Sequence, residues 1–208
     1  TVDPSYRQTF VYGNILVNGN GGATRLVHYG GDSGETEYSN YRKGTLYFYN
    51  NTVVVRADQG NRWRTCLLDV STLDEKVDVR NNIIYLSSAT DGATPTNMAL
   101  MCASGVATVS TNLGSPGIAK LSDSGTPNAV VNGMENILPI QGNNPGFVNL
   151  SGNDFQLTAG SQAVGAAVAV NAQAEAAGHG LTMEYLPHAG SKVRVENSTF
   201  NDIGAFEY

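Results

Sequence analysis

VYGNI at residues 11–15 is the first of four related segments in this 208-residue chain, followed by FYNNT at 48–52, VRNNI at 79–83 and VSTNL at 109–113. Each segment has apolar residues in alternation, then Asn, then another strand-forming residue. The repeat is too short for a βαβ unit with its loops, but it is long enough for one coil of three short strands. Repetition at such a period is typical of a solenoid.

A second strand pattern precedes each of the last three segments, at residues 25–29, 65–70 and 99–102. Each coil therefore has at least two strands in a fixed order. Strands of successive coils would pair in parallel, about 4.8 Å apart, and their Val, Ile, Leu and Phe residues would fill a dry interior. We expect an all-β fold, a right-handed parallel β-helix of about four coils with an irregular C-terminal capping region.

The Asn residues of the pattern mark the corners of the coils. Asn tolerates the left-handed backbone that a tight corner requires, and stacked identical side chains can hydrogen-bond from one coil to the next. We therefore predict a structural ladder along one edge of the stack, formed by Asn14, Asn51, Asn82 and Asn112.

The composition agrees with this architecture and excludes several functions. The chain has 24 Gly, 14% charged residues and a net charge of −6. An acidic surface argues against general binding to nucleic acid and against docking on anionic lipid. An acidic polysaccharide stays open as a partner, because a local cluster of Arg and Lys can act within an acidic protein. No apolar run is long enough to predict a membrane span.

The chain divides into two parts. Residues 1–113 hold the β-helix coils, and residues 114–208 are expected to form a loop and the C-terminal cap of the same solenoid, with a short helix within 162–177. No cap is evident before the first strand, and an open solenoid end exposes unpaired strand edges. We therefore expect upstream β-helix coils to dock there, either from an N-terminal fragment of the same precursor or from another subunit.

Three phrases resemble a known family: GTLYFYNNTVVV at residues 44–55, NPGFVNLSGNDFQLTAGSQAVGAA at 144–167 and DIGAFEY at 202–208. They are similar to a coil and to the C-terminal ending of bacterial secreted β-helix proteins in the pectate-lyase-like superfamily. The resemblance implies a secreted or cell-surface location. For function it implies a range, from polysaccharide lyases, epimerases and glycoside hydrolases to adhesins and phage tail spikes, because one fold hosts many activities.

A lyase acting on an acidic polysaccharide needs a cation beside the uronate carboxylate, a base and an acid. Four residues in or beside the insertion at 30–44 are candidates for catalysis: Lys43, Arg42, Tyr41 and His28. Four more are candidates for substrate binding: Arg56, Arg62, Trp63 and Arg64. An aromatic ring can stack on a pyranose while a guanidinium binds its acid. Simpler roles stay open, since basic residues at strand ends are often solvated and Trp63 could cover the core edge.

The sequence predicts no certain cofactor, and calcium is the one that its acidic residues could bind. Asp32, Glu35 and Glu37 could hold Ca²⁺ through carboxylate oxygens, although their spacing matches no EF-hand loop. Cys66 and Cys102 are expected to be free, mostly buried thiols, because their strands place them at different offsets and a disulfide needs Cα atoms within about 7 Å.

The leading hypothesis is an extracellular β-helix protein that binds or cleaves an acidic polysaccharide, of the lyase or epimerase type. The alternative is a non-catalytic surface, adhesin or tail-spike-like β-helix. On the first hypothesis the insertions should lie on one face of the solenoid. That face should then present Arg42, Lys43, Arg62 and Trp63 together.

Overall fold

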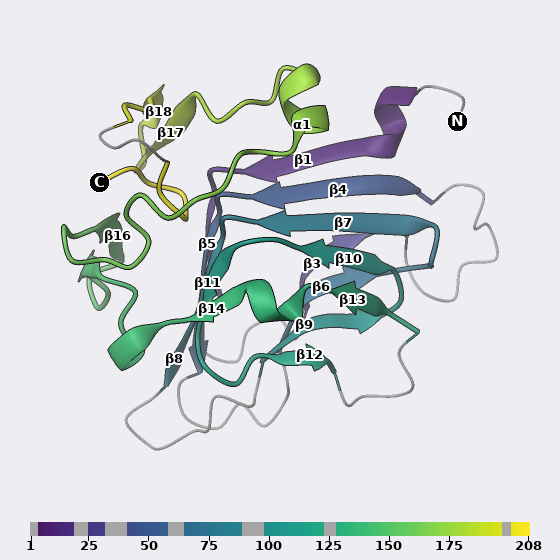
Figure 1. Ribbon diagram of the computed structural model, residues 1–208, viewed down its shortest axis with the longest axis horizontal. Coiled ribbons are helices and arrows are strands. Elements are labelled where there is room, and N and C mark those ends of the chain that lie inside the picture. Colours follow the sequence, from purple (N-terminus) through teal and green to yellow (C-terminus); the bar gives the residue numbers. More distant parts are fainter. Residues whose placement is uncertain are drawn as a thin grey trace.

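The computed structural model describes residues 4–18, 25–31, 41–57, 65–88, 98–122, 128–196 and 201–208. Within these residues, three parallel sheets form the walls of a stack of coils (Figure 1). The first sheet contains β1 (Gln8–Tyr12), β4 (Gly44–Tyr49), β7 (Glu75–Arg80), β10 (Val106–Val109) and β13 (Val130–Asn132). The second contains β2 (Ile15–Asn18), β5 (Thr52–Ala57), β8 (Ile83–Ser88), β11 (Asn112–Gly114) and β14 (Ile137–Pro139). The third contains β3 (Arg25–Tyr29), β6 (Thr65–Val70), β9 (Met98–Ala103) and β12 (Ala119–Leu121).

The chain visits the three sheets in turn, so the fold is the right-handed parallel β-helix that the repeat predicts. Neighbouring strands of a sheet belong to successive coils and pair in parallel register, as in Phe10 opposite Tyr47 and Val53 opposite Ile84. Such crossovers between parallel strands are right-handed in nearly all proteins. The periodicity of the sequence therefore translates directly into the stacking of coils.

The Asn ladder is confirmed at the corner between the first and second sheets. The side-chain Nδ2 of Asn14 donates to Oδ1 of Asn51 at 3.0 Å, and Nδ2 of Asn51 donates to Oδ1 of Asn82 at 3.0 Å. Nδ2 of Asn82 in turn donates to Oδ1 of Asn112 at 2.9 Å. At two of the corners the preceding residue has a left-handed backbone, with φ of 50° and 55°. Asn is suited to both tasks, because its short amide hydrogen-bonds locally and tolerates that backbone.

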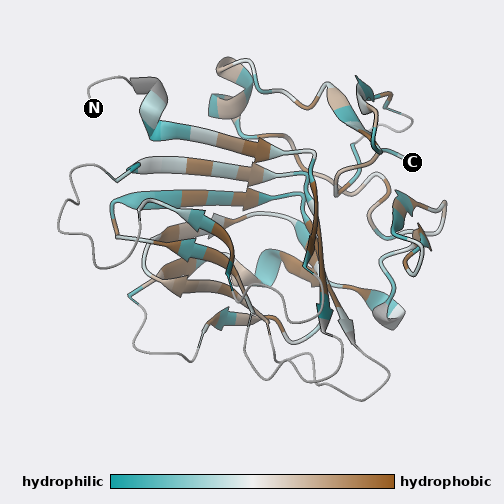
Figure 2. Ribbon diagram, turned by 180° about the vertical axis from the view of Figure 1, so that it is seen from behind, coloured by the Kyte–Doolittle hydropathy of each residue, from teal (hydrophilic) through white to brown (hydrophobic). Residues whose placement is uncertain are grey.

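The interior of the stack is apolar and closed to solvent. In the second coil the side chains of Phe48, Val53 and Leu68 are 0% exposed, as are Val79 and Ile84 of the third coil. Figure 2 shows hydrophobic residues as brown bands across the strands of successive coils. Burial of one such side chain stabilises the fold by about 1.5–3 kcal/mol, so the interior is the main source of stability.

The coils continue beyond residue 113, where the sequence predicted that they end. The strands β12, β13 and β14 pair in parallel with β9, β10 and β11. The corner pattern continues as well, since Nδ2 of Asn136 donates to the Val109 carbonyl at 2.9 Å and Nδ2 of Asn112 donates to the Val79 carbonyl at 3.1 Å. These late strands have three residues each. Three residues are too few to show an alternation, and the Ser, Gly and Pro residues between them read as a loop.

Residues 145–208, called the tail below, follow the last coil. They contain β15 (Phe147–Asn149), β16 (Asp154–Leu157), α1 (Ala172–Ala176), β17 (Met183–Leu186) and β18 (Gly190–Val193). Within the described residues the remaining short helices are 3-10 helices: η1 (Pro4–Arg7), η4 (Met134–Asn136) and η5 (Gln141–Asn143). The expected short helix is confirmed as α1. The tail runs along the side of the stack, back towards the first coil (Figure 1).

The tail buries the outer face of the second sheet. The outward-facing side chains of Val54 and Ile83 are 0% exposed, and they pack in one apolar cluster with Phe155 and Ile203 of the tail. The ring of Phe147 lies edge-on, 5.3 Å from that of Phe155. Both faces of β5 and β8 are therefore covered, which explains why these strands carry nearly continuous apolar runs.

The last residues of the chain are held by a buried ion pair. The Arg194 side chain is 0% exposed, and its guanidinium lies 2.8 Å from a carboxylate oxygen of Glu207. It also donates to the carbonyls of Ala205 (3.1 Å) and Asp202 (3.3 Å). The Asp202 carbonyl in turn accepts from Nδ2 of Asn50 at 2.9 Å. The chain end is thus attached to the Asn corner of the coils.

Candidate functional site

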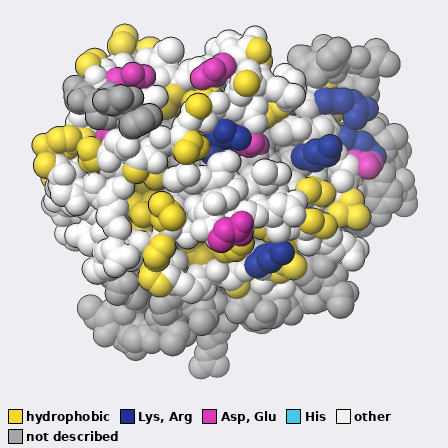
Figure 3. Space-filling view, in the orientation of Figure 1, with side chains coloured by type: hydrophobic (Ala, Val, Ile, Leu, Met, Phe, Trp, Pro, Cys, Tyr) yellow, Lys and Arg dark blue, Asp and Glu magenta, His cyan; other side chains and the backbone are white. Residues whose placement is uncertain are grey.

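Four basic residues lie together where the chain passes from the third sheet into the first. We call Arg7, Arg42, Lys43 and Lys76 the basic corner. Arg7 ends η1, and its backbone adjoins Gly44 at the start of β4. Lys76 lies one strand further on, because Thr45 of β4 pairs with it. Figure 3, in the orientation of Figure 1, shows Lys and Arg side chains gathered at the upper right of the molecule.

The guanidinium of Arg42 is fixed by two neighbours. It lies 4.8 Å above the centre of the Tyr6 ring, and one of its nitrogens donates to Thr9 Oγ1 at 2.9 Å. A guanidinium stacked on an aromatic ring keeps its edge available for hydrogen bonds. Arg42 is therefore oriented in advance for a planar acid such as a carboxylate.

Lys43 is paired with a carboxylate on the neighbouring coil. Its Nζ lies 2.5 Å from Oδ2 of Asp74, whose side chain is 64% exposed. This hydrogen bond and the charge of Lys43 lower the pKa of Asp74, and Arg7 lowers it further. Glu75, the next residue, is 0% exposed and turned inward, with Oε2 accepting from the Thr72 backbone amide at 2.7 Å. It therefore presents no charge to a ligand at the surface.

Tyr41 directly precedes Arg42 of the basic corner, whereas His28 lies on β3 in the third sheet. The Tyr41 ring is 6% exposed and lies against the backbone of Gly31 so closely that any side chain at that position would overlap it. His28 is exposed on β3, with Nε2 3.2 Å from Oγ of Ser71. Of these two candidates, only His28 is accessible to a substrate.

Arg56 lies at a different corner, where the chain leaves the second sheet. Its guanidinium donates to the Leu150 carbonyl at 3.2 Å and to Oδ1 of Asn153 at 2.5 Å, both in the tail. The structure therefore does not bring Arg56 to the basic corner, because the two groups follow different sheets. The other substrate-binding candidates lie outside the described residues: Arg62, Trp63 and Arg64.

The calcium candidates Asp32, Glu35 and Glu37 also lie outside the described residues. Within the described ranges, no group of three or more His, Cys, Asp and Glu side chains is placed to hold a metal ion. No helix in the same ranges is long and apolar enough to cross a membrane.

The two cysteines lie on the outer side of the third sheet. Both thiols are free and buried, as predicted. The Cys102 thiol lowers the pKa of Cys66, whereas the pKa of Cys102 is raised by the Cys66 thiol and by burial. Nearby, Arg25 forms an ion pair of 2.6 Å with Asp69, which is 2% exposed. Each thiol therefore packs as a small buried side chain beside a paired charge.

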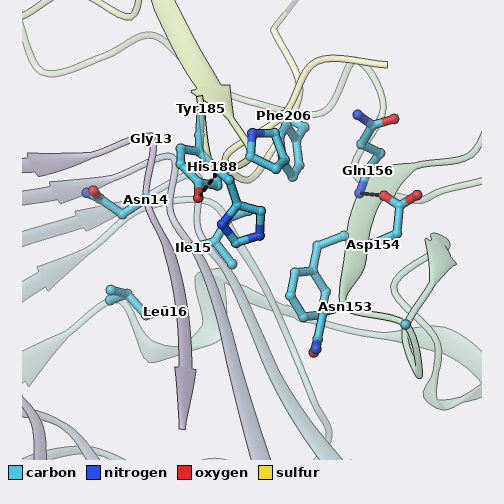
Figure 4. Close-up of a pocket in the computed structure, with 13 residues that line it drawn as sticks. Gly13, Asn14, Ile15, Leu16, Asn153, Asp154, Gln156, Tyr185, His188 and Phe206 are labelled. Carbon is cyan, nitrogen blue, oxygen red and sulfur yellow. Dashed lines mark hydrogen bonds between the residues drawn. The ribbon is translucent and has the colours of Figure 1, made fainter. Parts of the chain in front are cut away.

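A groove of about 710 Å³ lies between β2 and the tail. Asn14, Ile15 and Leu16 line one side, and side chains of the tail, among them His188 and Asp154, line the other (Figure 4). His188 sits at the turn between β17 and β18 with φ 58°, a left-handed backbone. Sequence reasoning did not find this groove, because its two walls are far apart in the chain.

Sequence reasoning also missed Arg7, Tyr6, Lys76 and Asp74 as parts of the basic corner. The signal was available in the repeat, because aligning the coils places Gln8, Thr45 and Lys76 at equivalent positions. Residues just before the first strand of successive coils are then neighbours in space.

Fold and site together define the class: a parallel β-helix protein with a basic corner across its first three coils and a tail packed along its side. No protein-family model matches the chain, and no curated protein or solved structure matches it either. The chemistry of the described surfaces is therefore the basis for a functional proposal.

Proposed function

We propose that this chain is part of an extracellular, carbohydrate-active β-helix protein of the pectate-lyase-like type, secreted or on the cell surface, that binds an acidic polysaccharide at the basic corner. One observation carries the proposal. Two cations act on the exposed carboxylate of Asp74, Lys43 at 2.5 Å and Arg7, and Arg42 and Lys76 extend the basic corner beside them, in a protein whose net charge is −6. Such a local excess of positive charge attracts polyanions despite the acidic whole.

The arrangement suits a polymer of uronic acids. Arg7 and Lys76 are exposed and lie on the first and third coils, with the Thr45 position between them. Strands of successive coils are about 4.8 Å apart, so a polysaccharide lying along the stack would present carboxylates to both cations. Arg42 would take a carboxylate in bidentate fashion, and the Tyr6 ring beneath it offers a face to a sugar.

In a lyase or epimerase reaction the cations would stabilise the charge that develops when the proton beside the uronate carboxylate is removed. The exposed imidazole of His28 is the residue that we assign as the base, because Tyr41 is buried and Lys43 is engaged by Asp74. That engagement also favours the alternative, a non-catalytic surface, adhesin or tail-spike-like β-helix that binds the polysaccharide without cleaving it.

Binding is tested by calorimetry with a panel of uronic-acid polysaccharides and neutral dextran. We expect uronate polymers to bind and salt to weaken them. Arg7→Gln and Lys76→Gln should each lower the affinity about two- to fivefold. Lys120→Gln, which removes an exposed charge on β12 away from the corner, is the matched control. Equal binding of dextran, or equal losses in the control, would exclude the basic corner as the site.

Catalysis is tested separately with the same polymers. A lyase produces an unsaturated uronate that absorbs ultraviolet light, and an epimerase exchanges the sugar proton with heavy water. Either signal should disappear in His28→Ala while binding persists. Binding with neither signal across the panel would select the non-catalytic alternative.

A further inference from the structure

The second sheet has an open edge at β2. Among the described residues β2 pairs only with β5. In a parallel sheet, alternate residues direct their backbone groups to opposite neighbours. Thr52, opposite Ile15, donates its N–H to the Asn14 carbonyl at 2.8 Å, towards the preceding coil. By the same geometry the N–H groups of Ile15 and Val17 point away from β5, into the open edge.

The Asn ladder has a vacant acceptor at the same place. Oδ1 of Asn82 accepts from the backbone N and from Nδ2 of Asn51, at 2.9 and 3.0 Å. Oδ1 of Asn51 accepts the same pair from Asn14, at 3.1 and 3.0 Å. Asn14 itself is exposed, and its Oδ1 accepts no hydrogen bond from any described residue. Asn14 therefore has room in the ladder for one more Asn, whose backbone N–H and Nδ2 would donate to its Oδ1.

The interior is also less covered in the first coil than in the second. Val11 and Leu16 are only partly buried, whereas Phe48 and Val53, which pair with them, are 0% exposed. A hollow of about 330 Å³ lies over this end, lined by Leu16, Leu26 and neighbouring residues. A further coil stacked on this end would cover these partly exposed apolar side chains.

The tail provides an outer wall for that layer. The groove of about 710 Å³ has β2 on one side and Tyr185, His188 and Phe206 of the tail on the other. Figure 4 shows these side chains on the side of β2 to which Ile15 points, which is its outer face. In the coils below, tail residues cover the outer faces of β5, β8 and β11, so here they would cover the outer face of an added strand.

We propose that this edge binds a β-strand coil segment of a partner polypeptide, in parallel, as one more layer of the second sheet. The segment would accept and donate main-chain hydrogen bonds at Ile15 and Val17. An Asn at its corner would donate to Oδ1 of Asn14, and apolar residues on either side of its backbone would cover Leu16 and meet the tail. Strand addition of this kind draws affinity from the main chain and specificity from alternate side chains.

A synthetic peptide tests this docking surface directly. The sequence FYNNTVVV, residues 48–55, is a coil segment that this protein already pairs with residues 11–18. With charged, dye-labelled ends for solubility, it should bind saturably in fluorescence anisotropy. A peptide with its second Asn replaced by Ala should bind about two- to tenfold more weakly, because the side-chain donor to Asn14 is lost while the backbone N–H remains.

Variants of the protein locate the binding. Val17→Pro removes an N–H at the open edge, where Pro is tolerated in strands, and should abolish peptide binding without a change in thermal unfolding. Val17→Thr keeps that N–H and should bind as well as the natural protein. Hydrogen exchange should slow at Ile15 and Val17 when peptide is added. Equal binding by Val17→Pro, or protection elsewhere in the chain, would overturn the proposal. The test is independent of the polysaccharide site, since the basic corner is unchanged in both variants.

Discussion

Asn51 illustrates how one residue type makes a corner of this fold. It is 0% exposed, and every polar group of its side chain is used. Its Nδ2 donates to the Val11 carbonyl of the preceding coil at 2.9 Å and to Asn82 of the following coil at 3.0 Å. Its Oδ1 accepts from Asn14. A buried polar side chain is stable only when it is satisfied in this way.

We expect Asn51→Leu to lower the free energy of unfolding by about 1–3 kcal/mol, because its neighbours would keep buried donors and acceptors without partners. Asn14→Leu is the matched control. It should cost less, since Asn14 is exposed and has a ladder partner on one side only. Urea unfolding of the three proteins measures the difference. Equal losses at both positions would contradict the view that the ladder stabilises through buried hydrogen bonds.

Position 204 can be occupied without strain only by glycine. Its φ is 101°, and a Cβ at this position would lie 2.8 Å from Cδ1 of Ile83 and 3.0 Å from Oγ1 of Thr52. Gly204→Ala should therefore destabilise the protein by about 1–3 kcal/mol, through backbone strain and overlap. Gly160→Ala is the control, because nothing lies within 4 Å of its Cβ, and it should change stability by less than about 0.5 kcal/mol. Thermal unfolding of both variants checks the contrast.

At the scale of elements, the tail is joined to the coils through the outward-facing residues of the strands. The rings of Phe10 and Tyr47 stack 5.0 Å apart on the first sheet, and those of Tyr12 and Tyr49 stack 4.8 Å apart. The region after α1 closes over them, with His179 stacked 4.0 Å from Phe10. The two aromatic pairs thus serve both the pairing of β1 with β4 and the attachment of the tail.

The pair Arg194 and Glu207 secures the segment after β18. We expect Arg194→Met to cost about 3–5 kcal/mol, because it leaves the Glu207 carboxylate buried without its cation. Arg194→Met combined with Glu207→Gln should recover part of that loss, since no uncompensated charge then remains. A double-mutant cycle by chemical denaturation measures the coupling. Additive losses in the cycle would show that the two side chains do not interact across the tail.

For the whole molecule, two apolar cores are separated by the second sheet. One fills the inside of the coils, and the other lies between the outer face of that sheet and the tail. The second core needs the tail, because the outward residues Val54, Ile83 and Leu113 would face water without it. The coils and the tail are therefore expected to fold as one cooperative unit.

A protein that ends after residue 144 tests this dependence. Without the tail, the outer face of the second sheet becomes a contiguous apolar surface, which favours association. We expect the shortened chain to bind an apolar dye strongly and to elute as oligomers or aggregates in size-exclusion chromatography with light scattering. A monomeric shortened chain with the unfolding temperature of the full chain would refute the role of the second core.

The sequence alone determined the repeating parts of this protein. The corner segments at 11–15, 48–52 and 79–83, the Asn ladder and the buried thiols were all predicted, because each depends on local alternation and on a residue type with one main use. The alternation of apolar residues along a strand predicts which side chains face inward. In a parallel stack that pattern also sets the register between the strands of successive coils.

The tertiary structure alone decided where the other parts lie. The strands at 119–121, 130–132 and 137–139 were hidden, because three residues carry too little periodicity and their partners in the sheet supply the rest. The place of the tail along the side, the basic corner and the groove at β2 each join residues from distant parts of the chain. Their positions depend on how far each insertion displaces the next strand and on which outward faces remain to be covered. Those are properties of packing between coils, and no local pattern of residues encodes them.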